Sequence, residues 1–108
     1  MYWIDENHSR IDGAPTNEEI KDRLEALGDG GFAILSLDDD SSYMQVSGNT
    51  YKDFYLEYHS PEAENMNIGT GLNPGPGVEI DEVVRCFSEF RDGITEFVNR
   101  HEWKEVHW

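Results

Sequence analysis

Three consecutive aspartates, Asp38, Asp39 and Asp40, form the most obvious candidate cation site in this sequence. A calcium loop of the EF-hand type needs oxygen ligands at alternating positions, a glycine at the sixth position and a glutamate at the twelfth. Counted from Asp38, those two positions hold Tyr43 and Asn49, so the pattern fails. The aspartates instead predict a solvated turn between two strands, because aspartate and the serines that follow it favour turns.

Histidine and cysteine can bind metals or act as nucleophiles, but their spacing here matches no known motif. His101 is followed by glutamate, as in zinc proteases, yet position 105 is Glu105 where that motif needs a second histidine. A polar helix end is therefore expected, with a chance metal site as the alternative. Cys86 is the only cysteine, and Glu82 and Glu89 lie about one helical turn from it and favour its neutral thiol. We expect a buried or half-buried Cys86, no metal site and no cofactor.

The remaining catalytic motifs also fail. No serine lies in a Gly-x-Ser-x-Gly turn, and the sequence contains no phosphate-binding loop of the Gly-x-x-x-x-Gly-Lys type. Gly69-Thr70-Gly71 does not continue into a dinucleotide-binding pattern, because Pro74 stands where the third glycine should be. The sequence therefore predicts a protein that is not an enzyme.

Two amphipathic helices are indicated. Thr16 and Glu19 have the spacing of a capping box, and apolar residues then recur along one helical face. A second apolar stripe runs over residues 80–98, and Gly93 predicts a kink or a break within it.

Several short segments have the alternation or apolar content of strands. We expect an edge strand at residues 2–4, a strand buried on both faces at 32–37, half-buried strands at 43–47 and 54–58, and a weaker one at 66–68. Short links between them favour an antiparallel meander. The predicted fold is one α+β domain over residues 1–108, with an antiparallel sheet of about four to five strands and two helices packed on one face.

The charge of the chain excludes several partners. The 108 residues include 23 acidic and 8 basic residues, which gives a net charge of -15, and acids outnumber bases in every third of the chain. Such a surface repels nucleic acids and anionic membranes, so neither is expected as a partner. Without a signal peptide or a long apolar run, a cytoplasmic location is expected. The acidity either serves solubility alone or attracts a basic partner.

The aromatic residues exceed what a small core can hold, which indicates a binding surface. Tyrosine and tryptophan are common anchors of interfaces, and acidic rims speed the encounter with a basic partner. The alternative is that the tyrosines only occupy an exposed sheet face, where they have good strand propensity. The predicted partner-binding residues are Asp38, Asp39, Asp40, Tyr43, Tyr55, Glu57 and Tyr58.

A set of short motifs carries a family resemblance. They are Pro15-Thr16-x-Glu18-Glu19-Ile20, Ile34-Leu35, Tyr43-Met44-Gln45-Val46, Leu56-Glu57-Tyr58, Glu82-Val83-Val84, Phe87-x-x-Phe90 and Glu102-Trp103. In this order the motifs resemble the small acidic immunity proteins of bacterial polymorphic toxin systems, especially their α+β families, and also proteins labelled only as uncharacterised bacterial proteins. The resemblance implies a cytoplasmic, non-enzymatic protein that binds and blocks a cognate toxin, often a nuclease or a nucleic-acid deaminase.

Two functions of different classes follow as expectations. The first is an immunity protein, monomeric or weakly dimeric, that neutralises a basic protein toxin through its acidic and aromatic surface. The second is a small acidic secretion chaperone or adaptor that holds a segment of an effector protein. The product of the neighbouring gene distinguishes them, because an immunity protein is expected beside a toxin and a chaperone beside a secreted effector.

Overall fold

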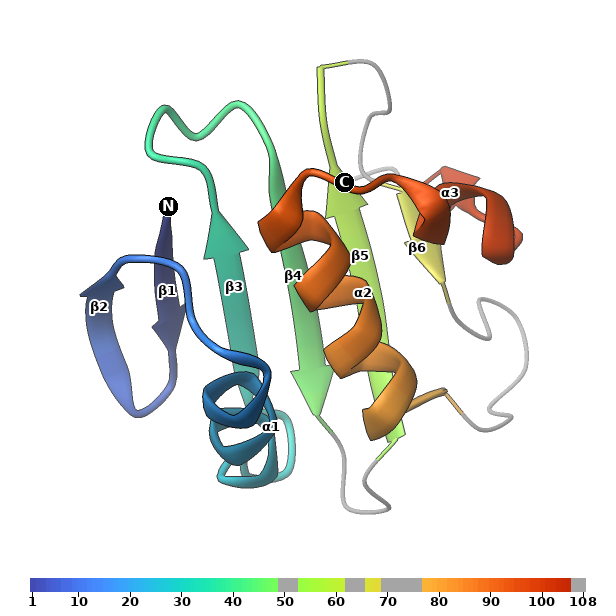
Figure 1. The fold of residues 1–108 in the computed structure, drawn as a ribbon. Coiled ribbons are helices and arrows are strands. Elements are labelled where there is room, and N and C mark those ends of the chain that lie inside the picture. Colours follow the sequence, from blue (N-terminus) through green and yellow to red (C-terminus); the bar gives the residue numbers. More distant parts are fainter. Residues whose placement is uncertain (49–52, 62–65, 69–76, 106–108) are drawn as a thin grey trace.

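The computed structural model describes residues 1–48, 53–61, 66–68 and 77–105 of the chain. Its strands form one antiparallel sheet in the order β2-β1-β3-β4-β5-β6-β8, and β7 also pairs with β5 (Figure 1). The strands are β1 (Tyr2–Asp5), β2 (His8–Asp12), β3 (Phe32–Ser36), β4 (Tyr43–Gly48), β5 (Asp53–His59), β6 (Met66–Ile68), β7 (Val78–Glu79) and β8 (Lys104–Glu105). The predicted meander is confirmed for β3 to β6, and the sheet has more strands than the four to five expected.

The helices lie on one side of the sheet, as predicted (Figure 1). Helix α1 (Asn17–Glu25) begins with the expected capping box, in which the Thr16 hydroxyl accepts from the Glu19 N–H and the Glu19 carboxylate accepts from the Thr16 N–H. Helix α2 (Ile80–Asp92) ends at Gly93, which has a φ of 76°. This left-handed conformation breaks the predicted stripe, so that a short third helix, α3 (Glu96–Arg100), follows.

The strand register divides the sheet into two faces. Trp3, Leu35, Met44 and Tyr58 pair in one row and point toward the helices, because partners in an antiparallel ladder share a face. These side chains pack with α1, α2 and α3 into the core, which is made by Trp3, Ile20, Leu24, Ala33, Leu35, Met44, Val46, Phe54, Leu56, Val78, Val83, Cys86, Phe87, Phe90 and Phe97.

The opposite side of the sheet is called here the outer face. It is formed by Tyr2, Ile4, Phe32, Ile34, Tyr43, Gln45, Ser47, Tyr55, Glu57 and His59, which occupy the alternate register positions. Most of these side chains are half-buried, and Phe32 is 38% exposed.

Two strand predictions were wrong. The strand at residues 2–4 is not an edge, because β2 pairs with its other side and forms the end of the sheet. The strand at 32–37 is not buried on both faces: Ala33 and Leu35 are fully buried, but Phe32 lies on the outer face and Leu37, beyond the strand end, is 36% exposed. An apolar run alone does not tell whether one or two layers cover a strand.

In the described part of the chain, no helix has the length and apolar character needed to cross a membrane. The sequence also favours a turn at Gly48-Asn49 and is rich in glycine and proline from Gly69 to Gly77. Asn49, residues 69–76 and the aromatic residues Tyr51 and Trp108 lie outside the described residues.

Candidate functional site

Three of the predicted partner-binding residues meet on the outer face. Glu57 pairs with Gln45 in the β4–β5 ladder, while Tyr43 and Tyr55 hold neighbouring register positions on the same face. Both tyrosines are half-buried, and burial, together with the negative charge of Glu57, raises the pKa of each phenol. The register therefore brings these three residues together on one face of the sheet.

Glu57 is buried without a hydrogen-bond donor. It is only 7% exposed, and no N–H or O–H group in the described part of the chain donates to its carboxylate. Removal from water raises its pKa, because burial disfavours the charged form. The sequence predicted only that Glu57 belongs to the partner-binding surface, and its burial is a new finding.

The other two buried acids of the described residues are satisfied. Asp5 is 4% exposed and accepts from Trp3 Nε1 at 2.7 Å and from the backbone N–H of Asn7 at 2.7 Å. Burial alone would raise the pKa of Asp5, but these bonds and one with His8 lower it. Glu89 is 7% exposed and accepts from Arg100 Nη2 at 2.6 Å. Glu57 therefore differs from both in having no hydrogen-bond donor among the described residues.

His59 lies two residues from Glu57 on the same face and also has an unsatisfied polar atom. Its Nδ1 is buried and has no hydrogen-bond partner among the described residues. Its ring stacks on Tyr43, with 4.9 Å between ring centroids and 25° between the ring planes. Sequence reasoning missed His59, although its alternation with Glu57 on one strand was a visible signal.

The three predicted aspartates lie in the turn between β3 and β4, as expected, but each has a local partner. Asp38 pairs with the N-terminal ammonium of Met1 at 2.6 Å, and Asp39 accepts from the Ser41 N–H and hydroxyl. Asp40 accepts from the Tyr2 hydroxyl. All three remain exposed, so they can contribute to the field near one end of the outer face.

The prediction that Tyr58 belongs to the same surface was wrong. Tyr58 pairs with Met44 and points toward the helices, away from Tyr43 and Tyr55. Its ring contacts Phe97 edge-on at 4.9 Å and also lies against Phe90 and Trp103. The period of two along β5 places residues 56 and 58 on the side opposite to residues 55 and 57.

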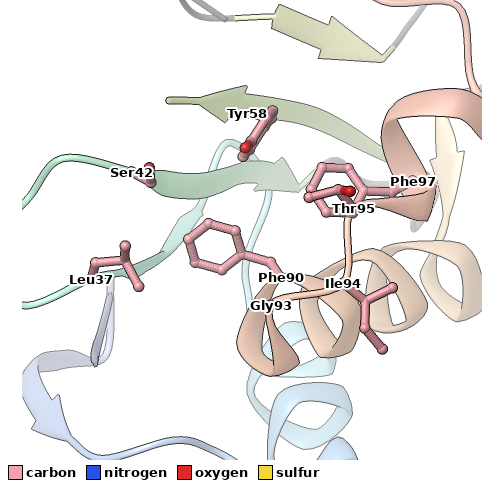
Figure 2. Close-up of a pocket in the computed structure, with 8 residues that line it drawn as sticks. All are labelled: Leu37, Ser42, Tyr58, Phe90, Gly93, Ile94, Thr95 and Phe97. Atoms are coloured by element: carbon pink, nitrogen blue, oxygen red, sulfur yellow. The ribbon is translucent and has the colours of Figure 1, made fainter. Parts of the chain in front are cut away.

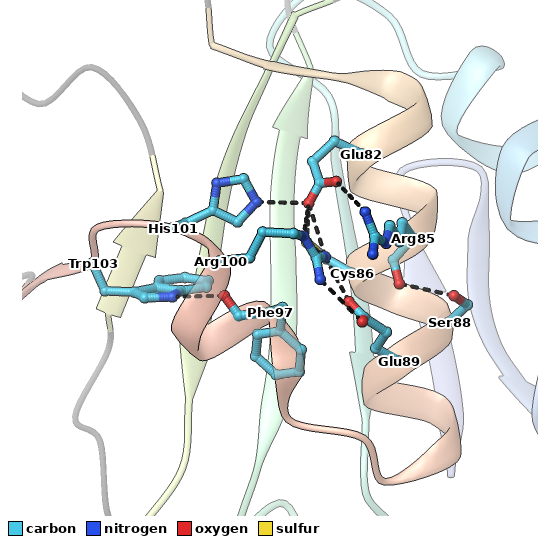
Figure 3. A network of polar contacts seen from close by, with 9 residues as sticks. All are labelled: Glu82, Arg85, Cys86, Ser88, Glu89, Phe97, Arg100, His101 and Trp103. Atoms are coloured by element: carbon cyan, nitrogen blue, oxygen red, sulfur yellow. Dashed lines mark hydrogen bonds and ion pairs between the residues drawn. The ribbon is translucent and has the colours of Figure 1, made fainter.

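A second polar cluster joins α3 to α2 (Figure 3). Glu82 Oε2 is its hub, accepting from Arg100 Nη2 at 2.9 Å and from the Cys86 thiol at 3.3 Å, and lying 2.6 Å from His101 Nε2. Glu82, Cys86 and His101 could together hold a metal ion, since their ligand atoms lie within 4.8 Å of one another. The Arg100 guanidinium, however, already supplies a positive charge there. We interpret this cluster as the attachment of α3.

Cys86 is fully buried, as predicted, and its environment keeps the thiol protonated. Burial, and then the carboxylate of Glu82, raises its pKa to about 12. We therefore expect the folded protein to react with iodoacetamide at pH 8 far more slowly than it does in urea, because the thiolate is the nucleophile. Mass spectrometry of the alkylated protein measures this, and equal labelling rates in the two conditions would contradict the structure.

An apolar cavity of about 180 Å³ lies where the β3–β4 turn approaches the loop between α2 and α3. Figure 2 shows its lining, which includes Leu37, Phe90, Ile94 and the ring of Tyr58. Leu37 and Ile94 are among the exposed large apolar residues. This cavity lies on the helix side of the sheet and is thus separate from the outer face.

Comparisons with known proteins give no relatives. No family model matches the chain, and neither a curated protein nor a solved structure is significantly similar to it.

Proposed function

We propose that this protein is an immunity protein, which binds a basic protein toxin through the outer face and neutralises it. The observation that carries the proposal is the grouping of Tyr43, Tyr55 and the buried Glu57 on a sheet face that neither α1 nor α2 covers. The Glu57 carboxylate accepts no hydrogen bond from the described residues. Aromatic anchors around a desolvated charge are typical of the energetic centre of an interface.

The overall charge supports a cationic partner. A toxin that acts on nucleic acid must present a basic groove to its substrate, and a chain with a net charge of -15 is attracted to that groove. The exposed aspartates Asp38, Asp39 and Asp40 add negative charge next to the outer face. In this arrangement the acids accelerate the encounter and the aromatic residues hold the docked complex.

The experiment begins with isolation of the partner from the native host and an assay of whether co-expression of this protein abolishes the partner's toxicity. We then expect association to slow markedly between 0.01 M and 0.15 M salt, because the Debye length falls from about 30 Å to about 8 Å. Dissociation should change much less. Stopped-flow kinetics measures both rates.

A matched pair of variants locates the steering charges. Replacing Asp38, Asp39 and Asp40 by asparagine should slow association more than neutralising the same number of acids on α1, namely Glu18, Asp22 and Glu25. Tyr55→Ala should instead raise the dissociation rate. A partner whose binding is insensitive to salt and to Tyr55→Ala would refute the proposal.

The apolar cavity favours one other function, a secretion chaperone or adaptor. The cavity has an apolar lining, on which a segment of an unfolded effector can pack, formed in part by Leu37, Phe90 and Ile94. Ile94→Asp would then abolish partner binding, whereas the immunity function predicts that this variant keeps it. The neighbouring gene, coding for a toxin or for a secreted effector, provides a second criterion.

A further inference from the structure

We propose that Glu57, His59 and Tyr43 form a receptor site for an arginine side chain, which a protein partner inserts into the outer face. The inference rests on the proposed function, since it names the chemistry by which the toxin would be recognised. It does not depend on the identity of that toxin.

The carboxylate of Glu57 has hydrogen-bonding capacity that the described residues do not use. A carboxylate can accept from several donors, and Asp5 and Glu89 accept from at least one each, but Glu57 receives none from the described residues. His59 lies two positions along the same strand, and its ring stacks on Tyr43 with 4.9 Å between the ring centroids. The carboxylate of Glu57 can therefore accept hydrogen bonds from a donor outside the described residues.

The second argument is that a guanidinium fits this set of groups. It is planar and permanently charged, and it can donate two parallel hydrogen bonds to one carboxylate. Its weak hydration also suits a site that is only 7% exposed at Glu57. A lysine ammonium lacks the fork geometry and is more strongly hydrated, so it should bind less well.

The aromatic rings provide the third argument. Guanidinium groups stack on the faces of aromatic rings, and Tyr43 and Tyr55 lie on either side of Glu57 along the outer face. The protein already contains one such pair on this face, because the Arg10 guanidinium lies over the Tyr2 ring at 4.0 Å from its centroid. Arg10 itself donates to Asp12 at 2.8 Å. The outer face is thus suited to an arginine from outside.

The probes for the test are N-acetyl-arginine amide and N-acetyl-lysine amide, titrated separately into the intact protein at low salt and followed by NMR. We expect the arginine amide to shift the signals of Tyr43, Tyr55, Glu57 and His59, and to bind several-fold more tightly than the lysine amide. Equal affinity for the two amides would overturn the inference, because general attraction to a chain of charge -15 does not distinguish them.

Two variants make the test specific. Glu57→Gln keeps the size of the side chain and should weaken arginine binding by roughly tenfold or more, since a hydrogen bond to a charged group is lost. Glu25→Gln removes the same charge from an exposed position on α1 and should leave the affinity unchanged. An unchanged affinity in Glu57→Gln, in a variant whose NMR spectrum shows a native fold, would overturn the site.

The inference and the proposed function can fail separately. If the arginine amide binds as expected but no toxic partner is neutralised, the arginine site stands and the immunity function falls. If a basic toxin is neutralised and the arginine amide does not distinguish Glu57→Gln from Glu25→Gln, the function stands and the arginine site falls.

Discussion

Replacing Phe97 by alanine is expected to lower the free energy of unfolding by about 3–5 kcal/mol, the range for removing a buried phenylalanine. Phe97 is 1% exposed and is the only residue of α3 in the core of the described chain. Its ring lies edge-on to Tyr58 at 4.9 Å and also contacts Trp103 at 6.0 Å. Its loss opens a cavity under a helix too short to be stable alone.

Urea denaturation at neutral pH measures this change, and Ile94→Ala provides the control. Ile94 is an apolar residue of the same segment but is 43% exposed, so its truncation should cost well under half as much. Equal and small losses in the two variants would mean that α3 does not pack on Tyr58. The interpretation of Tyr58 as a core residue would then be withdrawn.

The second large effect is a gain of stability. Glu57→Gln should raise the free energy of unfolding at pH 7 by about 1–3 kcal/mol, because a buried carboxylate that has no donor among the described residues is replaced by a neutral amide. The pKa of Glu57 is raised by burial, with Tyr43 and Tyr55 as its titratable neighbours. Below the ordinary pKa of 4.5 the side chain is protonated in both folded and unfolded chains, so the gain should vanish there.

The raised pKa of Glu57 therefore determines the direction in which the free energy of unfolding changes with pH. The wild type loses stability relative to Glu57→Gln as the pH rises through the raised pKa of the folded protein. Urea denaturation at pH 4 and pH 7 measures the difference. Glu89→Gln is the matched control, and it should destabilise the protein at pH 7 because Arg100 loses a charged partner. A destabilising effect of Glu57→Gln would show that its carboxylate has a partner in the folded protein.

Together with the arginine experiment, the Glu57→Gln variant shows whether Glu57 stabilises the fold or serves to bind an arginine. The same Glu57→Gln change should stabilise the free protein and weaken its binding of arginine. Such opposite effects are expected where a site keeps a destabilised group for function.

The periodic parts of the fold could be predicted from the sequence. The capping residues Thr16 and Glu19 and the alternation along β5 identified α1 and the central strands, because these patterns depend on local chemistry. Strand β2 was missed because its residues are mostly polar and exposed, and pairing with β1 rather than an apolar pattern defines it. The break at Gly93 was expected, but that α3 would turn back onto α2 depends on Arg100 meeting Glu82 and Glu89 across the fold.

The candidate site was predicted in part. Tyr43, Tyr55 and Glu57 lie together because they hold alternate positions on adjacent paired strands, which a sequence pattern can indicate. Tyr58 was placed with them although the same alternation turns it to the helix side. Neither the burial of Glu57 nor the buried Nδ1 of His59, which has no hydrogen-bond partner among the described residues, could be predicted. Both depend on which side chains surround these groups in three dimensions.

The central claim is that a cationic protein docks on the outer face, and hydroxyl-radical footprinting of the complex tests it most directly, because it reports side chains one by one. Phe32, Tyr43 and Tyr55 on the outer face should lose reactivity when the partner binds, while Leu37 and Ile94 at the apolar cavity should keep theirs. Protection of Leu37 and Ile94 with unchanged reactivity at Phe32, Tyr43 and Tyr55 would contradict the account.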